Sequence, residues 1–177
     1  MKKSTLLKPK LKTDSPYNST HLDAIGDILI HPDVQSMDRY PHHGAITCFE
    51  HSFSVSYYSF LLADRLGLDK VSIARGALLH DFYLYDWHKK GNRKGLHGFT
   101  HAKQSLANSQ SRFTLTPIEE DIILHHMWPM QPCVPSYLES YLVSLVDKLI
   151  SLIEVVKLVH FQPVQQIFPA MIIIYPR

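Results

Sequence analysis

Apolar residues recur at the three- and four-residue spacing of an amphipathic helix through three long stretches of this chain, residues 49–66, 70–85 and 136–159. Shorter segments with helix signals lie at 22–30 and in two further stretches, 100–108 and 116–126. No pair of segments has the alternating pattern and tight turn of a β-hairpin, and the sequence contains no visible internal repeat. The sequence therefore predicts an all-α fold, a bundle of about six helices.

Residues suited to helix ends stand at several of the expected boundaries. The stretch 116–119 combines a capping threonine, a proline at the first helical position and a glutamate three residues after the cap. Asp69 is expected to cap the helix that follows it, and Gly67 suits the left-handed turn that ends the helix before. One domain is expected over residues 19–160. A flexible basic tail, 1–18, precedes it, and the proline-containing segment 161–177 does not continue the helical pattern.

Charge and cysteine content narrow the class of protein. The net charge of +2, with 18 basic and 16 acidic residues, gives no field that would attract nucleic acid. Only Cys48 and Cys133 are present, which indicates a reducing compartment. The basic start lacks the apolar stretch of a signal peptide, and the apolar run 170–175 is much shorter than the roughly 20 residues of a membrane span. We expect a cytoplasmic protein that acts on a small molecule, with no membrane or nucleic-acid partner; nothing indicates its oligomeric state.

Histidine is unusually abundant, with 12 residues in a chain of 177. His51, the adjacent pair His80 and Asp81, and Asp147 fall on three separate expected helices, inside or beside apolar runs where a polar side chain needs a partner. Imidazoles and carboxylates from rigid elements are the ligands of catalytic transition metals. One metal ion could satisfy all four side chains.

Simpler explanations exist for the same residues. Asp147 shares a three- to four-residue spacing with Ser144, Ser151 and Glu154, which is also the pattern of a solvated helix face. Adjacent His and Asp residues also occur by chance at helix ends. Taken singly, each motif is weak evidence for a metal site.

The order of these motifs resembles that of the HD superfamily: a His, then a His-Asp pair, then a distant Asp within a long apolar helix. The matching stretches read FEHS around His51, LLHD ending in His80 and Asp81, and LVDK around Asp147, and the similarity covers roughly residues 39–154. The resemblance implies the helical HD fold and metal-dependent hydrolysis.

More specifically, the sequence is similar to HD proteins with two metal ions, in which extra histidines lie between the His-Asp pair and the final Asp. The resemblance implies that Asp81 bridges the first ion to a second one held by His101, His125 and His126, with His97 as an alternative to His101. Adjacent side chains on a helix point about 100° apart, so the His125–His126 doublet reaches one ion only if the helix ends or distorts there. If the doublet is split, His126 is the expected ligand and His125 a surface residue.

The chemistry implied by this resemblance is hydrolysis of a phosphomonoester or phosphodiester in a nucleotide or another small phosphorylated molecule. A metal-activated hydroxide would be the nucleophile, with Asp81 as the catalytic residue. One or two divalent ions are expected, Fe or Mn before Zn, Ni or Co. His43 and Lys148 are candidates for substrate contact. Two alternatives stay open: an oxygenase, like some two-iron HD proteins, or a non-catalytic sensor module that keeps the metal site.

Overall fold

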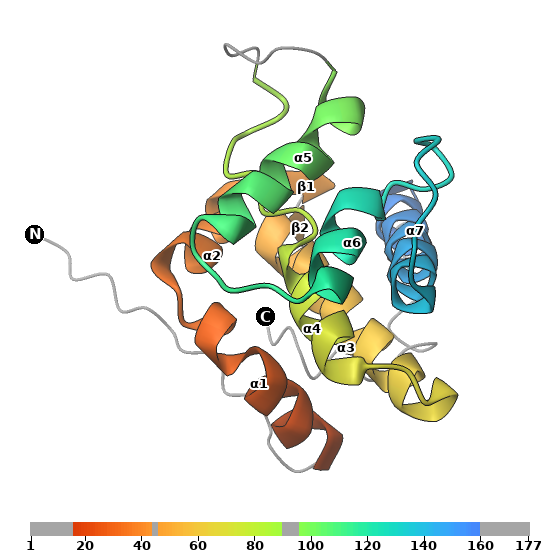
Figure 1. Cartoon of the computed structure of the whole chain (residues 1–177). Coiled ribbons are helices and arrows are strands. Elements are labelled where there is room, and N and C mark those ends of the chain that lie inside the picture. Colours follow the sequence, from red (N-terminus) through yellow and green to blue (C-terminus); the bar gives the residue numbers. More distant parts are fainter. Residues whose placement is uncertain (1–15, 44–45, 90–95, 160–177) are drawn as a thin grey trace, which may run out of the picture.

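The computed structural model describes residues 16–43, 46–89 and 96–159, and the all-α prediction is confirmed for these residues (Figure 1). The helices, in chain order, are α1 (Pro16–Leu29), α2 (Pro32–Ser36), α3 (Cys48–Leu66), α4 (Lys70–Leu79), α5 (His97–Gln110), α6 (Pro117–His125) and α7 (Leu138–Val159). Residues 16–18, included in the expected tail, belong to α1. The remainder of that tail and the segment 161–177 lie outside the described residues.

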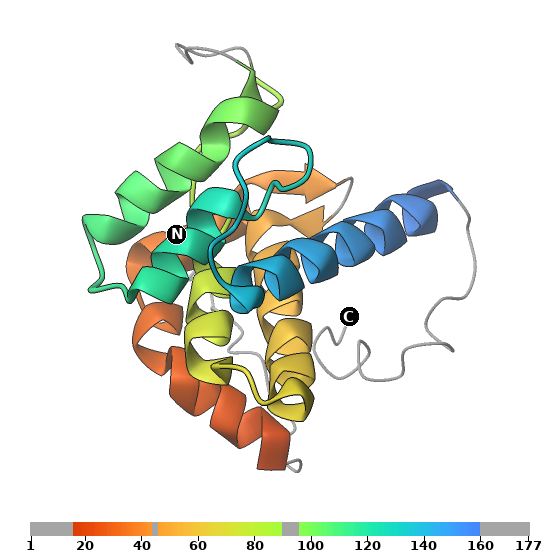
Figure 2. The same ribbon diagram turned by 45° about the vertical axis from the view of Figure 1, so that its right-hand side comes forward.

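Helices α3 and α4 pack against each other at the centre of the bundle. Helix α7 packs on α3, α6 packs on α4 and α7, α5 packs on α6, and α1 packs on α4. Figure 2 shows α7 running across α3, with its C-terminal end projecting beyond the other helices. Two apolar clusters form the core, one that includes Phe60 and Leu78 and one that includes Ile73 and Val146. Among the described helices, none combines the length and apolarity needed to cross a bilayer.

The helix ends follow the expected capping chemistry. Thr116 forms a complete capping box at the start of α6, Asp69 accepts two backbone N–H bonds at the start of α4, and Gly67 adopts the left-handed conformation with φ 70°. A further capping box, between Thr47 and Glu50, opens α3. It fixes the helix start at Cys48, three residues before His51, so the side chain at position 51 has a defined direction.

A short hairpin corrects the expectation that no pair of segments forms one. Strand β1 (Pro41–His43) pairs antiparallel with β2 (Ile46–Thr47), and a 3₁₀ turn (Met37–Arg39) precedes them. The backbone N–H of Cys48 donates to the carbonyl of Tyr40 at 2.8 Å. Because Thr47 both ends β2 and caps α3, the hairpin is anchored on the N-terminus of α3.

Helix α4 ends at Leu79, earlier than the expected boundary near residue 85. The chain turns at His80 and Asp81, and Phe82 and Tyr83 are buried without being helical. Their apolar character indicated a continued helix, but they fill the core from an irregular segment instead, since burial can override local propensity. The same turn directs His80 and Asp81 toward α7 and α5.

Candidate metal centre

Three buried histidines, His80, His101 and His126, share one arrangement. In each, Nδ1 hydrogen-bonds to the main-chain carbonyl three or four residues earlier, at 2.7, 2.8 and 2.9 Å respectively. A carbonyl can only accept, so Nδ1 carries the hydrogen and Nε2 presents a lone pair. These three Nε2 atoms face the carboxylates of Asp81 and Asp147. Such locking of the imidazole by an acceptor is typical of metal-binding histidines.

His51 has a carboxylate on each side of its ring. Its Nδ1 lies 2.9 Å from Oε2 of Glu154, and its Nε2 lies 3.1 Å from Oδ1 of Asp147. Burial alone would lower the pKa of His51, but the hydrogen bonds to the two carboxylates outweigh it and raise the pKa to about 10. The same pairing holds the pKa of the Asp147 carboxyl well below its usual value, against the effect of burial. His51 and Asp147, which are 96 residues apart in the sequence, are therefore in direct contact.

The two oxygens of Asp81 face different histidines. Oδ2 lies 3.5 Å from Nε2 of His80, whereas Oδ1 lies 3.3 Å from Nε2 of His101 and 3.7 Å from Nε2 of His126. Burial opposes ionisation of Asp81, but the surrounding imidazoles lower its pKa well below the usual value, so it is a carboxylate at neutral pH. Asp81 thus separates two sets of donors, as a bridging ligand would.

We name these sets by their members. The first donor group consists of His51, His80, Asp147 and Oδ2 of Asp81. Its members His51, His80 and Asp147 offer donor atoms within 4.8 Å of one another. The second donor group consists of His101, His126 and Oδ1 of Asp81. All six residues are less than a tenth exposed.

Buried nitrogen and oxygen atoms of these groups that have no hydrogen-bond partner indicate whether a cation fits between them. Nε2 of His80 and Oδ1 of Asp81 are buried and make no hydrogen bond. Nε2 of His101 and Nε2 of His126 approach to 2.8 Å although the Nδ1 atom of each ring already carries its hydrogen. Two facing lone pairs repel each other unless a cation or an extra proton lies between them. Adjacent donors on one transition-metal ion are about 3 Å apart, so the residues fit divalent metal ions.

The His125–His126 doublet is split. His125 is the last residue of α6, and its Nδ1 bonds to Oδ1 of Asp121 at 2.8 Å; His126 is the first residue past the helix. Among the described residues His125 belongs to no group with metal-ligand geometry. The structure therefore brings six of the seven expected ligands together and leaves His125 out, although its ring is half-buried against Asp121.

His97 supports His101 and does not replace it. The two rings stack with centroids 4.6 Å apart, and the carbonyl of His97 accepts the Nδ1–H of His101. The Nδ1 of His97 is hydrogen-bonded to the hydroxyl of Tyr85 at 2.9 Å. His97 thus fixes the ring plane of His101 from outside the second donor group.

Two residues of the centre were not identified from sequence, His42 and Glu154. Glu154 is 1% exposed, which contradicts the simpler explanation of it as part of a solvated face. Its position seven residues after Asp147, two helical turns along the same face, was the available signal. His42 lies on β1 beside His51, and its placement depends on the hairpin that the sequence pattern did not indicate.

The two candidates for substrate contact lie at the edge of the centre. His43 is half-buried, and one of its ring nitrogens lies within 4.8 Å of donor atoms of His42 and Glu154. The ammonium of Lys148 donates to the carbonyl of His126 at 2.8 Å and to the carbonyl and hydroxyl of Ser144 at 3.2 and 3.0 Å. With its three N–H groups engaged, Lys148 ties the end of α6 to α7, which favours a positioning role over direct phosphate contact.

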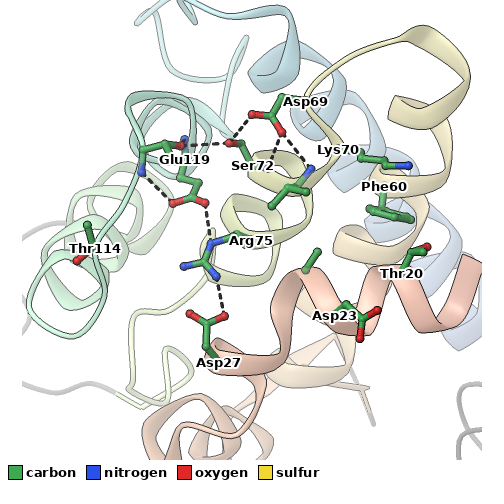
Figure 3. Close-up of a pocket in the computed structure, with 13 residues that line it drawn as sticks. Thr20, Asp23, Asp27, Phe60, Asp69, Lys70, Ser72, Arg75, Thr114 and Glu119 are labelled. Atoms are coloured by element: carbon green, nitrogen blue, oxygen red, sulfur yellow. Dashed lines mark hydrogen bonds and ion pairs between the residues drawn. The ribbon is translucent and has the colours of Figure 1, made fainter.

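A separate pocket lies between α1 and the N-terminal ends of α4 and α6 (Figure 3), and none of the six residues of the two donor groups lines it. Its most prominent side chain is Arg75, which pairs with Glu119 at 2.8 Å and with Asp27 at 2.6 Å. Its polar wall is largely satisfied by these internal pairs. The candidate metal ligands lie at the opposite end of α4, where His80 follows the helix.

Comparison with known proteins gives one match. The model of the HD domain matches residues 48–152, more than half of the chain. No curated protein and no solved structure matches the chain. The matched range contains all six residues of the two donor groups and excludes His42, His43 and Glu154.

Proposed function

The chain belongs to the HD domain family, and on that basis we propose that it is a metal-dependent phosphohydrolase that acts on a small phosphorylated molecule. The observation that carries the proposal is the division of Asp81 between two buried donor groups. Paired divalent ions at such a site lower the pKa of water and neutralise the charge that develops on a phosphoryl group during hydrolysis. The identity of the metal is part of the proposal: imidazole and carboxylate donors suit Fe or Mn, and also Zn, Ni or Co.

The side chains of the centre have distinct tasks in this proposal. Asp81 carries a negative charge at neutral pH because four imidazoles surround it, so it can orient a water molecule at the centre and accept a hydrogen bond from it. Glu154 holds His51, and backbone carbonyls hold the other three histidines, so the donor atoms need little rearrangement to bind. Burial of the six residues keeps bulk water away from the reacting atoms.

The test is phosphate release by the full chain loaded with Mn²⁺ or Fe²⁺, on a panel of phosphomonoesters and phosphodiesters. We expect turnover of at least one substrate, lost in Asp81→Asn, which keeps the shape of the side chain and removes the charge. His125→Ala serves as the matched control, because His125 lies outside both donor groups and should leave turnover intact.

Two results would contradict the proposal. Absence of phosphate release from every substrate, with oxygen consumption by the iron-loaded protein, would indicate the oxygenase alternative. Tightly bound metal without either reaction would indicate the sensor alternative. Retained turnover in Asp81→Asn would remove Asp81 from the catalytic role.

A further inference from the structure

His42 lies against the first donor group from a part of the chain outside the HD match. Strand β1 carries it over the start of α3, where its ring stacks on that of His51 with centroids 4.0 Å apart and an interplanar angle of 27°. Its Nδ1 lies 3.7 Å from Oδ2 of Asp81. That Nδ1 is buried and makes no hydrogen bond.

A hydrogen bond to Asp81 does not explain the buried position of Nδ1 of His42. At 3.7 Å the approach to Asp81 is too long for a hydrogen bond. The Nδ1 atom therefore lies beside an oxygen of the first donor group without a hydrogen-bond partner.

The distances suit a shared ion. One donor atom each from His42, His51 and Asp81 lie within 4.8 Å of one another. Donors on opposite sides of one transition-metal ion are about 4.2 Å apart, and neighbouring donors about 3 Å, so a small contraction would bring the three to ligand distances.

We propose that Nδ1 of His42 is an additional ligand of the cation held by the first donor group. The inference rests on the proposed function only in requiring that this cation binds. The first group then supplies three imidazoles and two carboxylate oxygens, which fill five of about six positions of an octahedral ion. The second donor group supplies only two imidazoles and one carboxylate oxygen.

This asymmetry bears on where the substrate would bind. An ion held by the first group would have about one position left for a water molecule. An ion held by the second group would have more, and the phosphoryl oxygens of the substrate would then bind near His101 and His126. The imidazole-rich first group also selects a transition metal over Mg²⁺, which prefers an all-oxygen environment.

The experiment measures Co²⁺ binding to the metal-free full chain and to its variants His42→Phe and His42→Ala. The visible absorption of the bound Co²⁺ reports the binding. Phe retains an aromatic ring that can stack on His51 and removes both ring nitrogens, which makes it the decisive variant. We expect the affinity of one of the two Co²⁺ ions to fall by at least about tenfold in both variants. We also expect its absorption spectrum to change, because a ligand is lost. His125→Ala should bind both ions as the wild type does, and thermal denaturation checks that each variant folds.

The two proposals fail separately. If His42→Phe binds two Co²⁺ ions with the affinity and spectrum of the wild type, His42 is not a ligand, whatever substrates the protein hydrolyses. If His42→Phe loses affinity and changes its spectrum while the wild type releases no phosphate from any substrate, the ligand role stands and the phosphohydrolase proposal fails.

Discussion

Glu154 provides the sharpest test of how the protein prepares its metal centre. Its Oε2 lies 2.9 Å from Nδ1 of His51, and the side chain is 1% exposed. A carboxylate in this position fixes the imidazole and increases the electron density at Nε2, and loss of such a partner typically lowers metal affinity by about 10- to 100-fold, or about 1.4 to 2.7 kcal/mol. We therefore expect Glu154→Gln to weaken Co²⁺ binding to the metal-free protein within this range.

A second substitution separates charge from orientation. The amide oxygen of Glu154→Gln still accepts the hydrogen bond from His51, so the ring keeps its direction and only the charge is lost. Glu154→Ala removes both and leaves a buried N–H without an acceptor, which should lower the free energy of unfolding by a further 1–3 kcal/mol, roughly, relative to Gln. Isothermal titration with Co²⁺ and urea denaturation measure the two effects.

The control is Glu139→Gln, which changes a half-buried glutamate in the first turn of the same helix, whose Oε1 accepts from the backbone N–H of Asp69 at 3.3 Å, and should leave Co²⁺ affinity unchanged. Equal Co²⁺ affinities for the wild type, Glu154→Gln and Glu154→Ala would refute the reasoning. Glu154 would then be a buried partner of His51 with no influence on the metal.

Two predictions concern the scaffold. His21 is buried with its Nε2 2.9 Å from the hydroxyl of Ser56, and burial lowers its pKa from 6.5 to about 4. In the unfolded chain His21 therefore binds a proton below about pH 6.5, whereas in the folded chain it binds one only below about pH 4. We expect this histidine to account for a loss of about 3 kcal/mol in the free energy of unfolding as the pH falls through that range. In His21→Leu the urea-denaturation curves should depend less on pH, and parallel pH profiles would contradict the assignment. A Cβ atom added at Gly76 would lie 3.0 Å from Cδ1 of Ile122, so Gly76→Ala should lower the melting temperature although alanine favours helices. Ile122→Val should relieve part of that loss, and an unchanged melting temperature in Gly76→Ala would show that α4 and α6 separate without penalty.

The helices that could be predicted from sequence are those whose ends have their own chemistry. Thr116 and Asp69 cap α6 and α4 through local hydrogen bonds, which depend on residues two or three positions away and can therefore be read along the chain. The capping box of Thr47 has the same local origin. Boundaries without such signals were less accurate: α4 ends at Leu79 because the core accepts Phe82 and Tyr83 from a turn, which is a property of the tertiary packing.

The candidate site was predictable to the extent that its residues lie on helices or directly after their ends. His51, His80, Asp81 and Asp147 form one constellation. Both His125 and His126 were predicted as ligands; the split of this doublet, which the sequence left as an alternative, follows from helix geometry once α6 is seen to end at His125. His42 could not be placed in the same way. It stands on a strand of three residues paired with a strand of two, too short for an alternating pattern to appear, and only the tertiary position of that hairpin brings it to His51.

Helix α7 shows why the solvated-face explanation of Asp147 fails. Its polar residues point inward, with Ser144 and Glu154 each 1% exposed, while Leu145 and Leu152 on the opposite side are 58% and 60% exposed. The periodicity of a helix divides it into two faces but does not determine which face is buried. Burying carboxylates without partners costs more than exposing leucines, so this orientation is stable only because imidazoles, and on our proposal cations, meet the polar face. The buried polar residues of α7, which lie beside the core residues Val146 and Ile150, therefore support a ligand-binding centre, since a core without a ligand would leave their charges without enough partners.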